Sequence, residues 1–492
     1  MNIAGLDIGT SGCKLSVYDD KGNFVYNSYK EYDVTRCDGA QTIDAKAIYA
    51  AALEVIKDCA EKCDISAIGV TTLGETFVAL DENDNVLLPS MLYTDPRGDK
   101  EVEKLIDKLG KEKLTYISGV KPHSMYSLPK IMWIKNNEPE IYSKIKRILL
   151  MEDFIVYMLT GIAQIDYSLA ARTMALDIRK KEWSKEIFDA VGVDVNLMST
   201  PVKTGSVAGK VKEELAKKLG LKDTIIVNGC HDQVASALGA GVFSVGTAAD
   251  GTGTVECVVP MFDKVPENKT LYDEGYSVVP YAFDNTYVCY ALSFTGGATL
   301  KWFRDNFAEL EKKEFGDKVY AALDGKIPQK PTDILILPHF SGAANPYMDT
   351  SSKAAILGLT LEHTKYDIYK ALMEGVTYEM MTNIEHLKSF GIEIDKLVAT
   401  GGGALSSVWL QIKADVLNRP ITTIIAKEAG TAGTCMLTAV ASGLFENLKD
   451  AGKVFVKENK TCMPKEDNAK IYQKQYNKYK KIYALTKEIV NE

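Results

Sequence analysis

The amino-acid sequence predicts an α/β protein built from two similar domains that face each other across a cleft. Three observations predict this fold class. At 492 residues the chain is too long for one hydrophobic core, which allows two large domains or about three ordinary ones. Short apolar runs typical of buried strands alternate with longer stretches of helical periodicity. An aspartate–glycine–threonine turn beside a strand occurs near the N-terminus and again near residue 250.

The first turn follows the opening strand. Residues 1–6 are an apolar run, and the turn DIGTSG at residues 7–12 leads into a second strand at 13–19. A third strand follows at 24–26, so the first turn joins two adjacent antiparallel strands at a sheet edge. Its glycines suit the close approach of an anion, Thr10 and Ser11 add hydroxyl donors, and Asp7 could hold a cation through water. An ordinary glycine-rich hairpin explains the same pattern.

The following segments predict the rest of the first domain. Residues 44–61 have helical periodicity, and residues 65–72 and 76–80 are expected to be strands. Between these strands lie Gly74 and Glu75, a charge in an apolar pattern that either is solvated or faces a cleft. Helices are predicted at 99–109, 128–136 and 151–159. The polar loop at 93–98 is interpreted as a surface turn, although a loop that lines a site has the same composition.

Asp232 stands where a buried strand meets a helix. Residues 224–229 form an apolar strand, the sequence CHDQ follows, and residues 234–238 are helical. An aspartate at this junction is a good helix N-cap. The functional alternative is a general base at the carboxyl end of a strand, where open α/β sheets place their sites. The neighbouring His231 is interpreted as a packed or capping residue.

The second turn lies at residues 246–254 and runs into a strand at 255–259. Two such turns in corresponding positions predict two domains that contact one phosphate chain, with their boundary near residues 241–242. Helices are predicted beyond it at 298–307, 366–390 and 404–418, and strands at 333–338 and 396–400. Glycines 401–403 form a phosphate or nucleotide cradle, or else serve close packing. Residues 469–489 predict a docked terminal helix.

Composition and missing motifs exclude several classes of protein. Hydrophobic residues make up 46% and charged residues 25%, as in soluble globular proteins. The net charge of −8 argues against nucleic-acid and anionic-membrane partners. Nine scattered cysteines suggest reduced thiols and a cytoplasmic location, and no signal peptide or membrane helix is visible. The sequence has no P-loop, Rossmann, zinc-site, metalloprotease or nucleophile-elbow motif.

Several segments together resemble the FGGY carbohydrate kinases, a family of the actin/Hsp70/hexokinase superfamily. The run MYSLPKIMWIKNN at residues 125–137 fits the family's N-terminal signature at each position. Residues 354–360 with 371–376 are similar to its C-terminal signature. Residues 401–404, ahead of Trp409 and Asp415, are similar to its adenosine loop, and residues 297–305 to another nucleotide-side segment. The resemblance covers nearly the whole chain.

The resemblance implies two actin-like (ribonuclease H-like) domains with mixed sheets flanked by helices and an ATP cleft between them. Residues 1–242 would hold the sugar site, the phosphate-1 loop and the base, and residues 243–492 the phosphate-2 loop and adenosine pocket. Asp232 matches the catalytic base, and Asp7 would help to hold Mg²⁺ through water. The residues implied for the substrate are Glu75, Thr76, Asp232 and Gln233. Those implied for ATP are Thr10, Ser11, Lys14, Gly251, Thr252, Gly253, Gly297, Lys301, Gly402, Gly403 and Ser406.

The implied reaction is transfer of the ATP γ-phosphate to a hydroxyl of a small sugar or polyol. Asp232 accepts the proton of that hydroxyl, and closure of the two domains excludes water. The resemblance also implies a possible homodimer. The alternative is a non-catalytic ATP-binding regulator or structural protein of the same superfamily. Asp232-Gln233 at a strand end, together with Glu75, favours the kinase.

The substrate is predicted from the residues before the strand at 76–80. The xylulokinase branch usually has Gln-Met-His-Gly there, whereas this chain has Gly74, Glu75, Thr76 and Phe77. Glu75-Thr76 resembles the Arg-Glu-Thr of the glycerol kinase branch, but Gly74 stands in place of the arginine. Because Gly74 removes a bulky donor, we expect a substrate larger than glycerol. A ketopentose, as for a xylulokinase, is favoured over a tetritol, glycerol or an aldonate.

Overall fold

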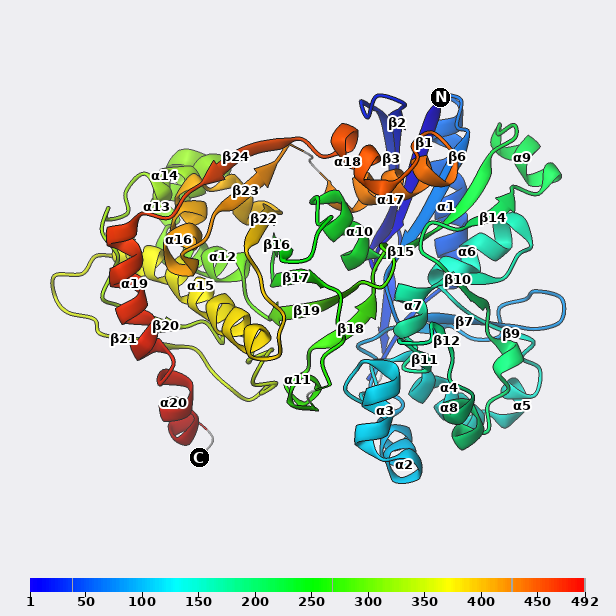
Figure 1. The fold of residues 1–492 in the computed structure, drawn as a ribbon, viewed down its shortest axis with the longest axis horizontal. Coiled ribbons are helices and arrows are strands. Elements are labelled where there is room, and N and C mark those ends of the chain that lie inside the picture. Colours follow the sequence, from blue (N-terminus) through cyan, green and yellow to red (C-terminus); the bar gives the residue numbers. More distant parts are fainter. Residues whose placement is uncertain (38, 268, 426–427, 491–492) are drawn as a thin grey trace.

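The computed structural model describes residues 1–37, 39–267, 269–425 and 428–490, and it consists of two lobes (Figure 1). A six-stranded sheet forms the first lobe, in the order β14 (Val207–Lys210), β15 (Ile225–His231), β6 (Ala67–Thr72), β1 (Asn2–Ile8), β2 (Gly12–Asp19) and β3 (Phe24–Glu31). A seven-stranded sheet forms the second, in the order β18 (Ser277–Pro280), β19 (Tyr287–Ser293), β17 (Glu256–Phe262), β16 (Thr247–Thr252), β22 (Lys396–Thr400), β23 (Ile421–Ile424) and β24 (Glu458–Cys462).

The two sheets repeat one topology. In the first, β1 pairs antiparallel with β2 and β2 with β3, whereas β1 pairs parallel with β6 and β6 with β15. In the second, β16, β17 and β19 form the antiparallel part, and β16, β22 and β23 form the parallel part. An antiparallel edge strand, β14 or β24, completes each series. The β1–β2 and β16–β17 turns therefore occupy equivalent positions, as their sequence similarity predicts.

Two predictions about these turns are wrong in detail. The β1–β2 turn is not at a sheet edge, because β1 lies between β2 and β6, and β3 forms the edge instead. The second turn is also shorter than the predicted 246–254, because residues 247–252 are strand β16. The glycine and threonine content that predicts a turn there marks the end of a strand that another backbone approaches closely.

The first sheet has a helix layer on each face. Alternate residues of β1, namely Ala4, Leu6 and Ile8, pack into the core that includes α1 (Ala45–Ala60). The other face of β1 lies against α17 (Ala429–Ala441), because a Cβ added to Gly5 would lie 2.8 Å from the Thr431 carbonyl oxygen. This late segment of the chain thus covers the first sheet, and Figure 1 shows it beside β1 and β6.

Helix α10 (Asp232–Gly239) links the two sheets and crosses α17 at glycines. A Cβ on Gly433 would lie 2.0 Å from the carbonyl oxygen of Ala235, and one on Gly239 would lie 1.7 Å from that of Ala429. Only glycine permits so close a helix crossing, which fixes the two lobes against each other at this point.

The second sheet packs against α15 (Lys365–Ser389) and α16 (Ser407–Leu417). Helix α12 (Gly297–Phe307) packs on α15, α19 (Glu466–Tyr479) packs on α16, and α20 (Ile482–Val490) follows. The predicted terminal helix over 469–489 is in fact two helices, α19 and α20, and α19 is docked as expected. Tyr472 donates to Glu374 at 2.8 Å and Tyr476 to Glu385 at 2.9 Å, both on α15. Buried tyrosines with satisfied hydroxyl groups explain the aromatic face of the tail.

The remaining elements surround the first sheet or extend the second lobe. The helices are α2 (Asp99–Leu109), α3 (Lys111–Ser118), α4 (Ser127–Asn137), α5 (Pro139–Tyr142), α6 (Met151–Thr160), α7 (Tyr167–Ala171), α8 (Lys185–Val191), α9 (Glu213–Leu219), α11 (Lys269–Asp273), α13 (Glu309–Phe315), α14 (Val319–Asp324) and α18 (Leu448–Phe455). Small sheets pair β4 (Val34–Cys37), β5 (Ala40–Ile43) and β8 (Ser90–Met91), β7 (Phe77–Leu80) with β9 (Arg147–Leu150), β10 (Gln164–Asp166) with β13 (Thr200–Val202), β11 (Leu176–Asp177) with β12 (Glu182–Trp183), and β20 (Leu335–Leu337) with β21 (Ala355–Leu357).

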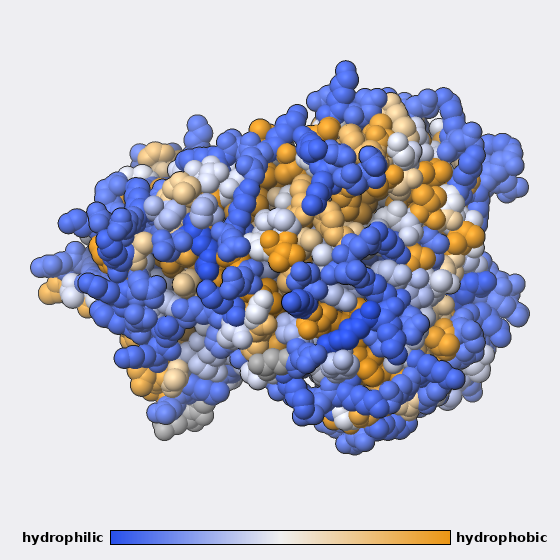
Figure 2. Space-filling model, in the orientation of Figure 1, coloured by the Kyte–Doolittle hydropathy of each residue, from blue (hydrophilic) through white to orange (hydrophobic). Residues whose placement is uncertain are grey.

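The lobes are in contact through the β18–β19 hairpin. The Val278 amide donates to the carbonyl of Gly119 at 2.8 Å, and the hydroxyls of Ser277 and Tyr126 are 3.0 Å apart. Figure 2 shows hydrophilic residues over most of the visible surface, with hydrophobic residues gathered toward the middle of the molecule. Among the helices of the described chain, none is long and apolar enough to cross a membrane.

Candidate active site

The β1–β2 turn carries the predicted phosphate-1 residues. Thr10 is half-buried and Ser11 exposed, and the turn is closed by the Gly9 amide, which donates to the Gly12 carbonyl at 2.9 Å. Lys14, on β2, forms an ion pair with Glu428, so a phosphate at Lys14 would compete with this carboxylate.

Asp7 is half-buried at the end of β1, just before the turn. Burial, followed by the charge of Glu428, raises its pKa to about 6, against a smaller opposing effect of Lys14. A carboxylate in this state gains from a nearby cation, since the cation would offset both the burial and the like charge.

Asp232 is the first residue of α10, directly after β15, as predicted. Its side chain is 38% exposed, but Oδ1 is buried and accepts no hydrogen bond from the described residues, although His231 Nε2 lies 3.2 Å away. Burial, then the charges of Asp7 and Glu75, raises its pKa to about 7. A carboxylate with this pKa can take a proton at neutral pH, as a general base must.

Glu75 forms a buried ion pair with Arg172, which sequence reasoning missed. Glu75 has a φ of 63°, and its carbonyl accepts from the Ser127 hydroxyl at 2.6 Å. Arg172 follows α7 and donates from Nε to Glu75 Oε1 at 2.6 Å, while Nη2 contacts the same oxygen. A signal was available: Arg172 is the one charge in the apolar run 169–175, and a buried arginine requires a partner.

The space beside Gly74 is filled, which corrects the reasoning about substrate size. A Cβ at this position would lie 3.0 Å from His231 Nε2 and 3.3 Å from Arg172 Cγ. The missing side chain therefore leaves no enlarged pocket at this point, because an arginine and a histidine from other segments occupy the space. Thr76, next to the ion pair, has a buried hydroxyl that finds no hydrogen-bond partner among the described residues.

The second lobe reaches this site through Tyr290 on β19. The Tyr290 hydroxyl is 2.8 Å from Nδ1 of His231. Burial, and secondly the nearby Arg172, lowers the pKa of His231 well below its usual value, so this imidazole is neutral. Gln233 is half-buried on α10 behind Asp232. The interpretation of His231 as a packed residue is therefore incomplete, because it connects the second lobe with Asp232.

Three predicted nucleotide segments meet at the end of β16. Gly251 and Thr252 end this strand, and the Gly297 amide donates to the Gly253 carbonyl at 2.8 Å. A Cβ on Gly403 would lie 2.6 Å from Thr252 Cβ, so the turn after β22 packs directly on this strand end. The close packing that was the alternative explanation for glycines 401–403 is thus present, and Gly402 remains exposed.

Two further predicted ATP residues have different surroundings. Ser406 caps α16: its hydroxyl accepts from the Trp409 amide at 3.0 Å and donates to Asp324 at 2.7 Å. Lys301 is exposed on α12. Ser406 therefore orders the helix that follows the glycine turn, whereas Lys301 is open to solvent.

A buried charge cluster lies beneath the β16–β17 turn. Lys413 on α16 contacts Asp250 at 2.5 Å, Glu256 at 2.6 Å and the Thr252 hydroxyl at 2.7 Å. All four side chains are fully buried. The cluster fixes the turn from below, and sequence reasoning missed it because Lys413 lies on a helix far along the chain.

The site residues thus form two groups, one on each sheet. In the first sheet, Asp7 lies near the end of β1, Asp232 directly after β15, and Glu75 and Thr76 in the loop after β6, which lies between these two strands. The predicted nucleotide glycines lie at or just after the end of β16, after β22 and at the start of α12. No group of three or more histidine, cysteine or acidic residues within the described ranges could hold a metal ion alone. The loop at 93–98 belongs to neither group: Tyr93, Thr94 and Pro96 are exposed, as predicted for a surface turn, whereas Asp95 is 1% exposed and pairs with Arg97.

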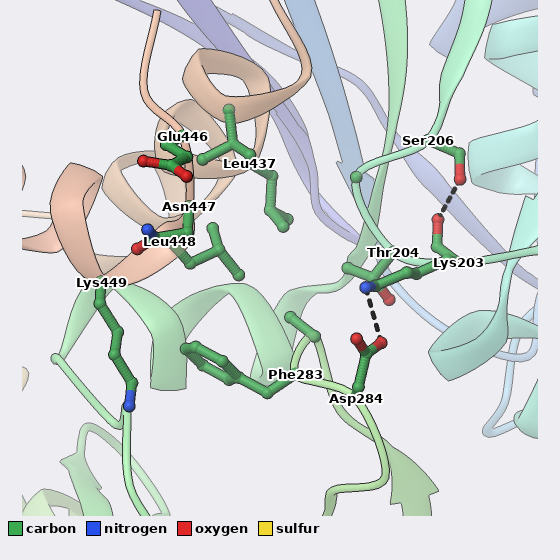
Figure 3. Close-up of a pocket in the computed structure, with 13 residues that line it drawn as sticks. Lys203, Thr204, Ser206, Phe283, Asp284, Leu437, Glu446, Asn447, Leu448 and Lys449 are labelled. Carbon is green, nitrogen blue, oxygen red and sulfur yellow. Dashed lines mark hydrogen bonds and ion pairs between the residues drawn. The ribbon is translucent and has the colours of Figure 1, made fainter. Parts of the chain in front are cut away.

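A separate cavity of about 460 Å³ lies between the lobes and contains none of the predicted site residues (Figure 3). Its walls are the segments 203–206, 282–284 and 446–449, together with Leu437 and Val440 of α17. Lys203 and Asp284 form an ion pair across it at 2.6 Å. Both side chains are more than half exposed, so this pair contributes little to the contact of the lobes.

Comparison with known proteins follows the same division into two lobes. The model of the "FGGY family of carbohydrate kinases, N-terminal domain" matches residues 2–239, and that of its C-terminal domain matches residues 269–442. The chain belongs to the FGGY family of carbohydrate kinases. This FGGY kinase is 28% identical over 503 residues to the xylulose kinase of Lactococcus lactis subsp. lactis (strain IL1403), covering 100% of the chain and 98% of that protein.

Another relative of this FGGY kinase has a different named substrate. It is 28% identical over 483 residues to the gluconokinase of Bacillus subtilis (strain 168), covering 95% of the chain and 93% of that protein. Its fold is that of the ligand-bound xylulose kinase from Lactobacillus acidophilus, with a TM-score of 0.90, 24% identity, and coverage of 100% and 99%. The predicted family and the two-domain actin-like fold are therefore confirmed, and the activity class is that of a sugar kinase.

Proposed function

We propose that this FGGY kinase transfers the γ-phosphate of ATP to a hydroxyl of a neutral sugar. A ketopentose is the favoured substrate. The observation that carries the proposal is Asp232, a carboxylate open to the site at a strand end with one buried, unpartnered oxygen and a raised pKa. The xylulose kinases among the relatives support a ketopentose, and the gluconokinase makes an aldonate the alternative to test.

The chain's own groups suffice for binding and proton transfer. Asp232 accepts the proton of the attacking hydroxyl, while Arg172, Thr76 and Gln233 supply hydrogen bonds that orient the sugar. The turn at half-buried Thr10 and exposed Ser11 offers backbone and hydroxyl donors to the phosphates, whereas the Gly253 amide already donates to the Val255 carbonyl at 2.9 Å. Contact of Tyr290 with His231 holds the second lobe over the first, which limits access of water.

The surroundings of Asp7 fit Mg²⁺ held with the nucleotide. Magnesium usually binds through one or two carboxylates, substrate phosphates and water, so a single raised-pKa aspartate beside a phosphate turn is enough. When bound, Mg²⁺ would neutralise charge on the phosphoryl oxygens. Asp7 itself would act through water, as the resemblance implied.

The test is an ADP-release screen over pentuloses, hexuloses, polyols and aldonates, with wild type and Asp232→Asn. We expect a neutral sugar to be phosphorylated and the variant to lose activity by about two orders of magnitude or more, while it still binds ATP. Phosphorylation of glycerol alone would disprove the prediction of a larger substrate. ATP binding without turnover on any substrate would favour the non-catalytic regulator.

A further inference from the structure

The buried ion pair between Glu75 and Arg172 borders the catalytic carboxylate. Both side chains are 6% exposed, and the charge of each acts on the pKa of Asp232. The pair comes from segments 97 residues apart, the loop before β7 and the end of α7. The left-handed backbone of Glu75, which a non-glycine residue rarely adopts, keeps its carboxylate turned toward Arg172.

The guanidinium of Arg172 is held on both sides but keeps one donor unused. Its centre lies 5.0 Å from the ring of Tyr126 and 5.5 Å from that of Tyr290. Nε and Nη2 contact Glu75, whereas Nη1 is buried and has no hydrogen-bond partner within the described residues. An unsatisfied buried donor on a charged group is costly, and such groups are typical of sites completed by a ligand.

The charges around this donor favour a neutral ligand. Asp7, Glu75 and Asp232 are acidic, and His231 is neutral. The charge of Arg172 acts on Asp232 and that of Glu75 on Lys130, while Lys14, which acts on Asp7, is itself paired with Glu428. Glu75 already cancels the charge of Arg172 in a buried environment. A ligand carboxylate would therefore gain little from Arg172, whose charge Glu75 balances, and it would be repelled by Asp7 and Asp232. A hydroxyl or carbonyl oxygen of the ligand would need only the hydrogen bond.

We propose that the Glu75–Arg172 pair determines substrate class: Arg172 Nη1 donates to an uncharged oxygen of the sugar, and Glu75 excludes substrates that carry a carboxylate. This inference rests on the proposed kinase function and narrows it to neutral ketoses and polyols. It also gives Glu75 a role different from that of a direct acceptor, since its Oε1 is bound to Arg172. Arg172 supplies the donor that Gly74 lacks, from another part of the chain.

The experiment measures kcat/KM for the neutral sugar found in the screen and for its aldonate counterpart. Glu75→Gln keeps the shape of the side chain but leaves Arg172 charged and uncompensated. We expect the aldonate-to-neutral ratio to rise about tenfold or more, the effect of one charge-assisted hydrogen bond. Arg172→Gln should raise KM for the neutral sugar about tenfold through loss of the same kind of bond, with a smaller effect on kcat.

Two further variants keep the test decisive. Arg147→Gln is the control, because Arg147 also pairs with an aspartate and lies over a tyrosine ring, yet it is half-exposed at the start of β9 and contacts none of the predicted site residues in these two interactions. It should leave both substrates unaffected. If Glu75→Gln does not fold, the double variant Glu75→Gln/Arg172→Gln removes both charges, and it should lose affinity for the neutral sugar without gaining the aldonate.

The outcomes separate the inference from the function on which it rests. A ratio that stays within about twofold of wild type in Glu75→Gln, with unchanged KM in Arg172→Gln, would show that the pair is only structural. A wild type that prefers aldonates would overturn the inference while leaving a sugar kinase. A wild type that phosphorylates no sugar would overturn both.

Discussion

The pH dependence of catalysis is predicted from the surroundings of Asp232, the proposed general base. A base must be deprotonated to act, and burial with two nearby carboxylates raises its pKa to about 7, from an ordinary value of 3.8. With this pKa, about nine tenths of the molecules carry the ionised base at pH 8 and about one tenth at pH 6. We therefore expect kcat/KM for the sugar to fall about tenfold between pH 8 and pH 6. An ordinary aspartate would give no change in this range.

The assay is steady-state ADP release with saturating ATP, measured as a function of pH. Its controls test whether the fall in kcat/KM at acidic pH, the acid limb of the profile, comes from Asp232. Glu75→Gln removes a negative charge that raises the pKa of Asp232, so the limb should move to lower pH. Asp7, with a pKa of about 6, responds instead to Glu428 and Lys14. Glu428→Gln should therefore leave the acid limb near pH 7 unchanged. It should shift only the part of the pH profile at lower pH, where Asp7 is protonated.

Two results would refute this reasoning. One is a kcat/KM that is constant from pH 8 to pH 6, since Asp232 would then be ionised throughout or would not be the base. The other is an Asp232→Asn variant that keeps more than about a tenth of wild-type turnover, because loss of a general base costs about 10²–10⁴-fold.

The remaining predictions concern stability. Lys413→Met leaves Asp250 and Glu256 buried without their cation, so the free energy of unfolding should fall by about 3–5 kcal/mol in urea titrations. Lys396→Met, which breaks an exposed pair, should cost about 1 kcal/mol or less, and equal losses would argue against a buried cluster. Gly433→Val places a Cβ 2.0 Å from a carbonyl oxygen of α10, so the thermal midpoint should fall by the equivalent of about 1–3 kcal/mol or more. Gly325→Ala is the control, because the nearest atoms to its Cβ would be 3.6 Å away, and it should change the midpoint little.

The sequence predicts most of the fold because its local signals agree. The apolar runs at 65–72, 224–229 and 396–400 are strands β6, β15 and β22 to within two residues, and the long helical pattern at 366–390 is α15. Strand β16 was missed because glycine and threonine residues at its end resemble a turn, and its strand state comes from pairing with β17 and β22 on both sides.

A site residue could be predicted only where a pattern within one segment of the sequence identifies it. Asp232 at a strand end and the glycine turns have local patterns, but the partners of Glu75 and His231 do not. Arg172 reaches Glu75 from 97 residues away, and Tyr290 reaches His231 from the other lobe. Side-chain pairs of this kind depend on the tertiary fold, and no local sequence pattern identifies both partners.

The repeated topology shows how two equivalent turns can serve different roles. Asp7 and Asp250 precede the glycine turns of the two sheets at corresponding positions. Asp250 is neutralised inside the protein by Lys413, so its turn is fixed and has no need of an external cation. Asp7 lies near a second acid instead, and its raised pKa favours a bound cation there. The acid that fits Mg²⁺ therefore lies in the first lobe, which also carries Asp232, the proposed base.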